Sequence, residues 1–211
     1  MLLLAFDTAT PAITVALHDG EDVLASVGGE GSMAHGEWLV PFIAQAIEEA
    51  GVTMADLTDI AVGVGPGPFT GLRVGVVTAL TLGSTLGLRT HGACSLDIIA
   101  SQVHSDVDFL VATDARRKEV YWARYRADGR RVDGPAVLRP ADLAIIHPNM
   151  PAYGRGATQY ADDLAAVDGP QDPDAAALAT AVVNGSVEAL PLEPLYLRRP
   201  DAVPLVQVKR A

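Results

Sequence analysis

Two tandem α/β units are predicted for this chain of 211 residues, and three features of the sequence predict them. Short apolar segments alternate with turn residues at the N-terminus, which is typical of strands. Two longer apolar segments follow and have the length of helices. A second series of short apolar segments then begins near residue 110. With 49% hydrophobic and 19% charged residues, the chain has the composition of a globular protein.

The first 30 residues are expected to form an antiparallel meander of three strands. We place the strands at 2–8, 13–17 and 23–27, because turn residues separate these apolar segments. Helices are expected from 36 to 50 and from 69 to 86, with a short buried strand at 60–64 between them. The glycines after the third strand predict a flexible loop; they are Gly28, Gly29 and Gly31.

The second half of the chain repeats the pattern of the first. Leu3–Ala9 and Leu110–Arg116 are both apolar segments that carry an Asp at the same place, Asp7 in one and Asp114 in the other. In each half a second strand and a turn with glycine follow. We interpret this pattern as an internal duplication.

The duplication predicts an N-terminal unit of residues 1–104 and a reduced C-terminal unit of residues 105–211. Units that each open with strands and an Asp in the first turn are the layout of the actin-like ATPase fold (ASKHA, ribonuclease H-like). In that fold the first turn faces the metal and the phosphates of a nucleotide. Asp7, Thr8 and Thr10 have suitable side chains and are candidates for a vestigial nucleotide site. An Asx-turn with a purely structural role is the alternative.

The formal net charge of −11 argues against a protein that binds nucleic acid by itself, since such proteins need a basic face. The short basic clusters are Arg116–Lys118, the pair Arg130 and Arg131, and the pair Arg198 and Arg199. We interpret them as exposed turn residues. If RNA is involved, we expect a partner to carry most of the contact.

A single cysteine, Cys94, excludes a disulfide within the chain and is expected to be a small packing residue. The N-terminus has no basic segment, and its apolar run ends at Asp7. This pattern predicts a strand rather than a signal peptide. We therefore expect a cytoplasmic protein.

The most specific segment is Gly63–Gly75, with the sequence GVGPGPFTGLRVG. Its glycines and prolines force one backbone path between a strand and a helix. A glycine-rich turn at a helix start is able to hold an anion, but the Gly-Lys-Ser/Thr ending of a Walker loop is absent. We expect a tight packing turn here.

This segment resembles the hallmark G-x-G-P-G-S-F-T-G-L/I-R-I/V-G of the TsaB (YeaZ) family. Pro68 and Gly36 stand where that family has Ser, so neither position offers a hydroxyl. The resemblance covers nearly the whole chain, because further family motifs have counterparts in the same order. They are the first strand and turn at 4–10, HGEWL at 35–39, SLD at 95–97, DARRKEVY at 114–121 and LEPLYLR at 192–198.

The resemblance implies an actin-like fold and a role in forming N6-threonylcarbamoyladenosine in tRNAs that read codons starting with A. In that system a TsaC-type enzyme makes threonylcarbamoyl-adenylate, and a TsaD-type paralogue transfers the group to tRNA. A TsaB protein pairs with the TsaD-type subunit, and a TsaE-type ATPase binds the pair. The resemblance therefore implies a non-catalytic dimerisation subunit that meets tRNA through the complex. ATP and Mg²⁺ are then held by the partners, and this chain alone binds no cofactor tightly.

Two other functions are alternatives. A metalloprotease of the glycoprotease family would need two His on one helix face, and a stand-alone actin-fold kinase would use Asp7 and Asp114. No two histidines are three or four residues apart, so we predict no metal site. The members of a Ser-His-Asp triad need not be close in sequence, so the spacing leaves that alternative open; the resemblance implies that this chain has no catalytic residue. The histidines are His18, His35, His91, His104 and His147.

The helix expected at 69–86 is apolar on all sides, which predicts that all its sides are buried. Small residues fall four apart along it, and this spacing lets another backbone approach closely. We expect one side to face the chain's own sheet and another to face a second subunit. The residues predicted at this partner interface are Trp38, Phe42, Gly71, Leu72, Gly75, Val76, Ala79, Leu80 and Gly83.

The same helices predict that the chain can form a homodimer when it is alone. A membrane span is an alternative for residues 69–86, but the run is short, rich in Thr and interrupted by Arg73. Replacing Val76 or Leu80 by Asp is expected to abolish binding to a TsaD-type partner without unfolding the chain.

Overall fold

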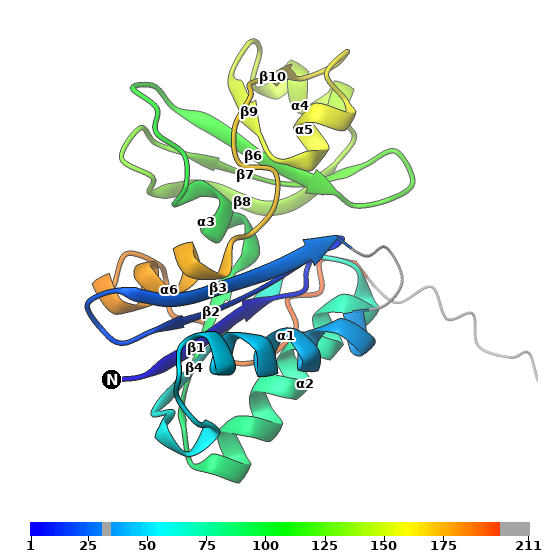
Figure 1. Ribbon diagram of the computed structural model, residues 1–211. Helices are drawn as coiled ribbons and strands as arrows, with labels where there is room; N and C mark the ends of the chain where they lie inside the picture. The colour runs from blue at the N-terminus through cyan, green and yellow to red at the C-terminus, as the bar shows by residue number, and fades with distance from the viewer. Residues whose placement is uncertain (31–34, 199–211) are drawn as a thin grey trace, which may run out of the picture.

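The computed structural model describes residues 1–30 and 35–198, and within these it contains two five-stranded sheets (Figure 1). In the first sheet the strands lie in the order β3-β2-β1-β4-β5. The first three strands form the predicted antiparallel meander, and β4 runs parallel to β1 and β5. The strands are β1 (Leu3–Asp7), β2 (Ala12–His18), β3 (Val23–Glu30), β4 (Asp59–Gly65) and β5 (Arg89–Cys94).

The second sheet repeats this topology. Its order is β10-β9-β6-β7-β8, so β6, β7 and β8 form an antiparallel meander and β9 and β10 add on in parallel beside β6. Each strand therefore has an equivalent in the first sheet, which confirms the predicted duplication of topology. The strands are β6 (Phe109–Asp114), β7 (Val120–Tyr125), β8 (Arg131–Leu138), β9 (Pro151–Tyr153) and β10 (Ala165–Ala166). β9 and β10 are short, as expected of a reduced unit.

Helices cover both faces of the first sheet (Figure 1). Along β1 the side chains alternate between the two faces: Leu4 and Phe6 join a core with α1 and α2, whereas Leu3 and Ala5 join a core with α6. The helices of this half are α1 (His35–Glu49), α2 (Phe69–Leu86) and α6 (Ala175–Asn184), and a 3₁₀ turn spans Met54–Asp56.

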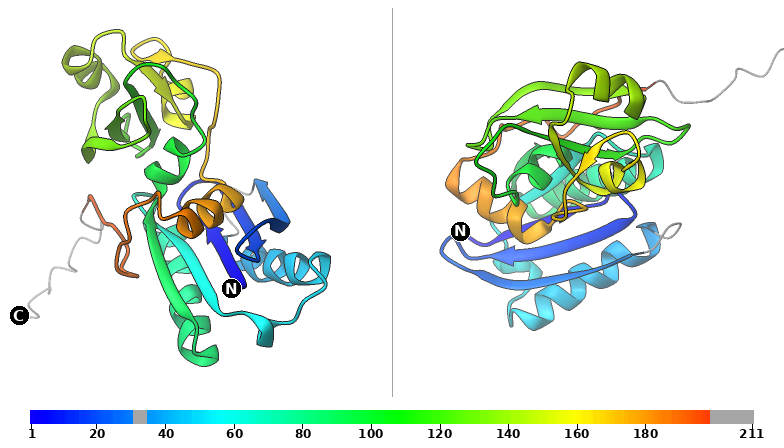
Figure 2. Two further views of the ribbon diagram at one scale, coloured as in Figure 1. Left: turned by 90° about the vertical axis from the view of Figure 1, so that its left-hand side faces the viewer. Right: turned by 90° about the horizontal axis from the view of Figure 1, so that it is seen from above.

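A second core lies around the second sheet. One face packs against α3 (Ser95–Ala100), and the other against α4 (Pro140–Ile146) and α5 (Arg155–Gln159). Figure 2 shows that α3 and α6 lie between the two sheets. These two helices therefore connect the two units.

The structure differs from two predictions. Gly28 and Gly29 belong to β3 rather than to a flexible loop, because the meander pairs them with Ile13 and Thr14. The predicted C-terminal unit of 105–211 is too long, since the chain returns to the first sheet. There α6 packs on β1, and the Leu195 backbone N–H donates to the Val64 carbonyl oxygen at 2.8 Å. The predictions for Gly31 and Arg199 lie outside the described residues.

Helix α2 is long and apolar enough to meet the criterion for a membrane span by length and composition. In the fold its inner side packs against the first sheet, where Val76 and Ala79 are fully buried in the core. The helix ends at Gly87, whose φ of 69° is the left-handed conformation that closes helices.

Candidate functional site

The first candidate site is the turn after β1, where Asp7 is buried. Its Oδ1 accepts a hydrogen bond from the Ala9 backbone N–H at 2.6 Å, which is an Asx-turn. Its Oδ2 accepts a hydrogen bond from the Ser95 hydroxyl at 2.6 Å, and the Ser95 oxygen in turn accepts one from the Gly65 N–H at 3.2 Å. The carboxylate therefore joins β1, α3 and the end of β4.

The two threonines of this turn are buried as well. Thr8 donates its hydroxyl hydrogen to the Gly71 carbonyl oxygen of α2 at 2.8 Å. An added Cβ at Gly75 would lie only 2.5 Å from the Thr8 hydroxyl oxygen, so the helix sits directly against this turn. Asp7, Thr8 and Thr10 lie in one buried turn, in an arrangement that fits the structural Asx-turn.

The glycine- and proline-rich turn between β4 and α2 closes the space in front of Asp7. A Cβ added to Gly67 would lie 2.3 Å from the Ala9 carbonyl oxygen, so the two turns are in direct backbone contact. The cavity left beside them, lined in part by Thr10, Pro68 and Asp114, has a volume of about 20 Å³. Ligand sites usually offer about 300–1,000 Å³. This cavity by itself is too small for a nucleotide.

The predicted partner interface divides into two sets. Trp38 and Leu80 are exposed, at 49% and 48%, and Phe42 is half-buried with its ring 5.7 Å from that of Trp38. The prediction is wrong for the other six, because they are buried within the chain itself. These are Gly71, Leu72, Gly75, Val76, Ala79 and Gly83.

The reason is the close approach of α2 to its own sheet. A Cβ at Gly83 would lie 2.7 Å from the Thr90 methyl group, and one at Gly75 would lie close to Thr8 and Val62. The line of small residues therefore accommodates β5, β4 and the turn after β1 rather than another subunit. Replacing Val76 by Asp would therefore place a charge in the core. Sequence reasoning missed Val40 and Val77, which are exposed apolar residues on the outer sides of α1 and α2.

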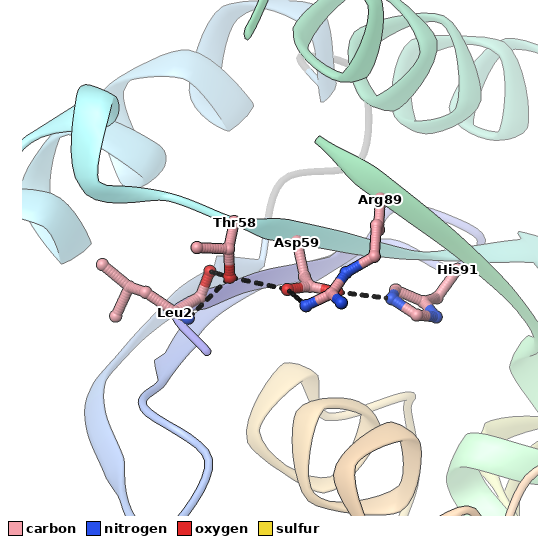
Figure 3. Close-up of polar contacts among 5 residues, drawn as sticks. All are labelled: Leu2, Thr58, Asp59, Arg89 and His91. Atoms are coloured by element: carbon pink, nitrogen blue, oxygen red, sulfur yellow. Dashed lines mark hydrogen bonds and ion pairs between the residues drawn. The ribbon is translucent and has the colours of Figure 1, made fainter. Parts of the chain in front are cut away.

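An ion cluster around the buried Asp59 lies at the opposite end of β4 from the glycine-rich turn (Figure 3). Asp59 accepts two hydrogen bonds from the Arg89 guanidinium, at 2.9 and 2.8 Å, and one from the Thr58 hydroxyl at 2.6 Å. His91 Nε2 lies 2.9 Å from Asp59 Oδ1. Burial alone would raise the pKa of Asp59, but these hydrogen bonds outweigh it and lower the pKa to about 2. The cluster joins β4 and β5 and is remote from the cleft.

A cavity of about 750 Å³ lies beside α3 and the turn between β7 and β8. At its floor Asp97 accepts hydrogen bonds from the Tyr125 hydroxyl at 2.7 Å and from Arg131 at 3.2 Å. Burial raises the pKa of Asp97. Its walls mix both signs of charge, because Asp106, Asp128, Glu188 and Arg130 line it too. Among the described residues, no group of three or more His, Cys, Asp or Glu is arranged to hold a metal ion.

Comparison with known proteins gives the family. A family model described as TsaD, tRNA N6-adenosine threonylcarbamoyltransferase, matches residues 22–194. The tRNA threonylcarbamoyladenosine biosynthesis protein TsaB of Escherichia coli K12 is 33% identical over 161 residues, which cover 71% of this chain and 66% of that protein. The chain belongs to the TsaB/YeaZ branch of this family.

Two further relatives match nearly the whole of this chain. An uncharacterised protein of Mycobacterium tuberculosis H37Rv is 47% identical, over 96% of this chain and 94% of its own length. The crystal structure of a Pseudomonas aeruginosa protein, described as similar to the peptidase YeaZ, superposes with a TM-score of 0.79 at 29% identity. It covers 93% of this chain and 99% of that one. With the duplicated sheets, this likeness confirms the predicted actin-like α/β fold.

Pro68, which stands where the family has Ser, lines the small cavity beside the turn after β1. The signal for Ser95, the buried partner of Asp7, was present in the SLD motif, but its role as a hydrogen-bond donor depends on the fold.

Proposed function

We propose that this chain is a non-catalytic subunit in the biosynthesis of N6-threonylcarbamoyladenosine in tRNA. The observation that carries the proposal is the closed cleft: Gly67 packs on the Ala9 backbone, and about 20 Å³ remain beside the turn that holds nucleotide phosphates in catalytic members of the fold. The E. coli relative bears the name of this pathway. A chain that keeps the fold but closes its cleft is suited to support another subunit.

In this proposal the supported subunit is a TsaD-type transferase, and a TsaE-type ATPase binds the pair. The partners hold ATP and Mg²⁺, and this chain alone binds no cofactor tightly. Because the chain carries a net charge of −11, tRNA is held mainly through the complex. A homodimer of the free chain and a cytoplasmic location, where tRNA is modified, complete the proposal.

The outer sides of α1 and α2 are the proposed surface for the transferase subunit. Val77 is 57% exposed and Leu80 48%, although both are large apolar side chains on one helix. Contiguous apolar patches are rare on the surface of monomers and often mark interaction sites. Covering them with a partner would remove apolar area from water and stabilise the complex.

The test is binding of a purified TsaD-type partner to the wild-type chain and to Leu80→Asp. We expect Leu80→Asp to weaken binding at least tenfold, since a charge would be buried in an apolar contact. The matched control is Ile145→Asp. Ile145 is 78% exposed and belongs to α4, which packs against the second sheet rather than the first. Equal binding by all three proteins would contradict the proposed surface. Tight ATP binding by the isolated chain would instead favour the kinase alternative.

A further inference from the structure

We propose that residues 188–198 form a clasp that holds the two units together and couples partner binding on α2 to the closed state of the cleft between them. This segment follows α6 and alternates its contacts between the units. It meets β8 first, then the first sheet, and last the turn between β6 and β7. The clasp is an inference about the free chain, and its link to the partner rests on the proposed function.

The clasp begins with a contact to the second unit. Arg131 of β8 donates to the Glu188 carboxylate at 2.6 Å and to Asp97 of α3 at 3.2 Å. The Glu188 side chain is 63% exposed, and ion pairs with so exposed a member contribute little to stability. This pair therefore directs the path of the segment, and the contacts that follow hold it in place.

The middle of the clasp is fixed to the first sheet by its backbone. The Leu190 N–H donates to the Gly92 carbonyl oxygen at 2.8 Å, and the two residues form an antiparallel bridge at the edge strand β5. A Cβ at Gly92 would lie 2.6 Å from the Leu190 carbonyl oxygen, so this approach requires glycine. Further along, the Leu195 N–H bonds to the end of β4 at Val64.

Two leucines of the clasp are shared between the hydrophobic cores of the units. Leu190 and Leu195 pack against the core that the first sheet forms with α1 and α2, and also against the core that the second sheet forms with α3. Moving the units apart would expose these side chains to water, at a free-energy cost proportional to the apolar area. The clasp therefore stabilises the closed arrangement.

The clasp ends beside the cleft. Its last residues line a cavity of about 210 Å³ between the glycine-rich turn and the turn after β6. Arg198 donates to the Ala115 carbonyl oxygen of that turn at 2.9 Å and pairs with Glu119. A direct hydrogen bond across the cleft, from the Tyr121 hydroxyl to the Gly67 carbonyl oxygen, is longer at 3.5 Å. Hydrogen bonds weaken towards this length, so the shorter bonds of the clasp contribute more to closure.

The clasp also contacts the helix that carries the proposed partner surface. The Tyr196 ring stacks on Phe69 at 5.2 Å, and Arg73 of α2 donates to the Tyr196 hydroxyl at 3.2 Å. The Arg73 guanidinium lies 3.8 Å from the centre of the Phe69 ring. Arg73, Val77 and Leu80 are exposed and spaced i, i+4 and i+7, so they lie on one side of α2.

This placement couples the clasp to the partner. A subunit that covers Val77 and Leu80 would also meet Arg73 and exclude water from its hydrogen bond to Tyr196. Hydrogen bonds are stronger in a medium of low dielectric constant, so a bound partner would reinforce the clasp. Because such coupling is reciprocal, an intact clasp strengthens partner binding by the same factor.

The test compares the full-length wild-type chain with Leu195→Ala, which weakens the packing of the clasp on both cores. Arg198→Gln is a second variant, which removes the contacts with Ala115 and Glu119 without emptying a core. The matched control is Leu2→Ala, the same substitution at a half-buried leucine that packs on the first core at the end of β1 away from the Asp7 turn.

Hydrogen exchange is measured by mass spectrometry, with and without a purified TsaD-type partner. Peptides covering 5–11 and 63–69 report on the two turns at the cleft. A peptide covering 37–49 in α1 distinguishes opening of the cleft from unfolding of the whole chain. Affinity for the partner is a separate readout.

For the free chain, we expect exchange at the cleft to be about tenfold faster in Leu195→Ala, faster to a smaller extent in Arg198→Gln, and unchanged in Leu2→Ala. Exchange in α1 should stay the same in all of them. Cleft exchange in Leu195→Ala that equals the wild type or Leu2→Ala would overturn the clasp. If Leu195→Ala unfolds, Arg198→Gln decides, and cleft exchange at the wild-type rate in that variant would overturn it.

With the partner, we expect cleft exchange in the wild type to slow about fivefold and Leu195→Ala to bind about fivefold more weakly than Leu2→Ala. Partner binding that leaves cleft exchange unchanged would overturn the coupling. Failure of the wild type to bind the partner would contradict the proposed function instead, and the comparison on the free chain would still decide whether the clasp holds the units together.

Discussion

The buried Asp59 cluster gives a prediction whose size follows from its geometry. Asp59 is 1% exposed and accepts hydrogen bonds from Arg89 and Thr58, which hold its pKa near 2 instead of the usual 3.8. This difference corresponds to about 2 kcal/mol of folding stability. Because the folded-state pKa lies below the unfolded-state pKa, the stability is fully present well above pH 4. It is lost as the pH falls through 2.

The perturbation is Asp59→Asn, and the assay is urea unfolding followed by circular dichroism at several pH values. At pH 7 we expect the variant to lose about 2–4 kcal/mol, since an uncharged amide leaves Arg89 and His91 without their anion. The difference from the wild type should shrink by about half at pH 3. Asp162→Asn, at an exposed position, serves as the control. A loss that is small at pH 7, or that does not change with pH, would refute this reasoning.

Three further predictions follow from the site. Gly67→Ala should destabilise the protein by about 2 kcal/mol or more in thermal unfolding, because its Cβ would lie 2.3 Å from the Ala9 carbonyl oxygen; an unchanged melting temperature would contradict the closed cleft. Cys94 should resist thiol reagents at pH 8 in the native protein and react after unfolding, since burial raises its pKa to about 12. Val77→Asp should weaken partner binding while the urea midpoint changes little, because Val77 is exposed; unfolding of this variant would contradict its placement.

Much of the fold was predictable from the sequence because local patterns determine it. The meander of β1 to β3 follows from apolar segments separated by turns, and the repeat around Asp7 and Asp114 predicted a second unit that opens with three strands. The path of the last segment was not predictable. That α6 returns to β1 depends on which apolar faces remain uncovered after the sheets form, and no local pattern carries this information.

The site was predicted less well, for physical reasons that particular residues illustrate. Gly75 and Val76 lie on an all-apolar helix, and periodicity alone does not tell the side that faces the chain's own sheet from the side that faces outward. Thr8 has the side chain of a phosphate ligand, yet its hydroxyl bonds to α2. Arg198 reaches the turn at Ala115 from 83 residues away, and such contacts arise only from the tertiary fold.

The most direct test of the account is the formation of threonylcarbamoyladenosine in tRNA by purified TsaC-, TsaD- and TsaE-type proteins. We expect strong product formation only when this chain is added, little with Leu80→Asp, and full activity with Ile145→Asp. We also expect no product from this chain without the TsaD-type subunit. Product at the same rate in its absence, or turnover by this chain without that subunit, would contradict a supporting role.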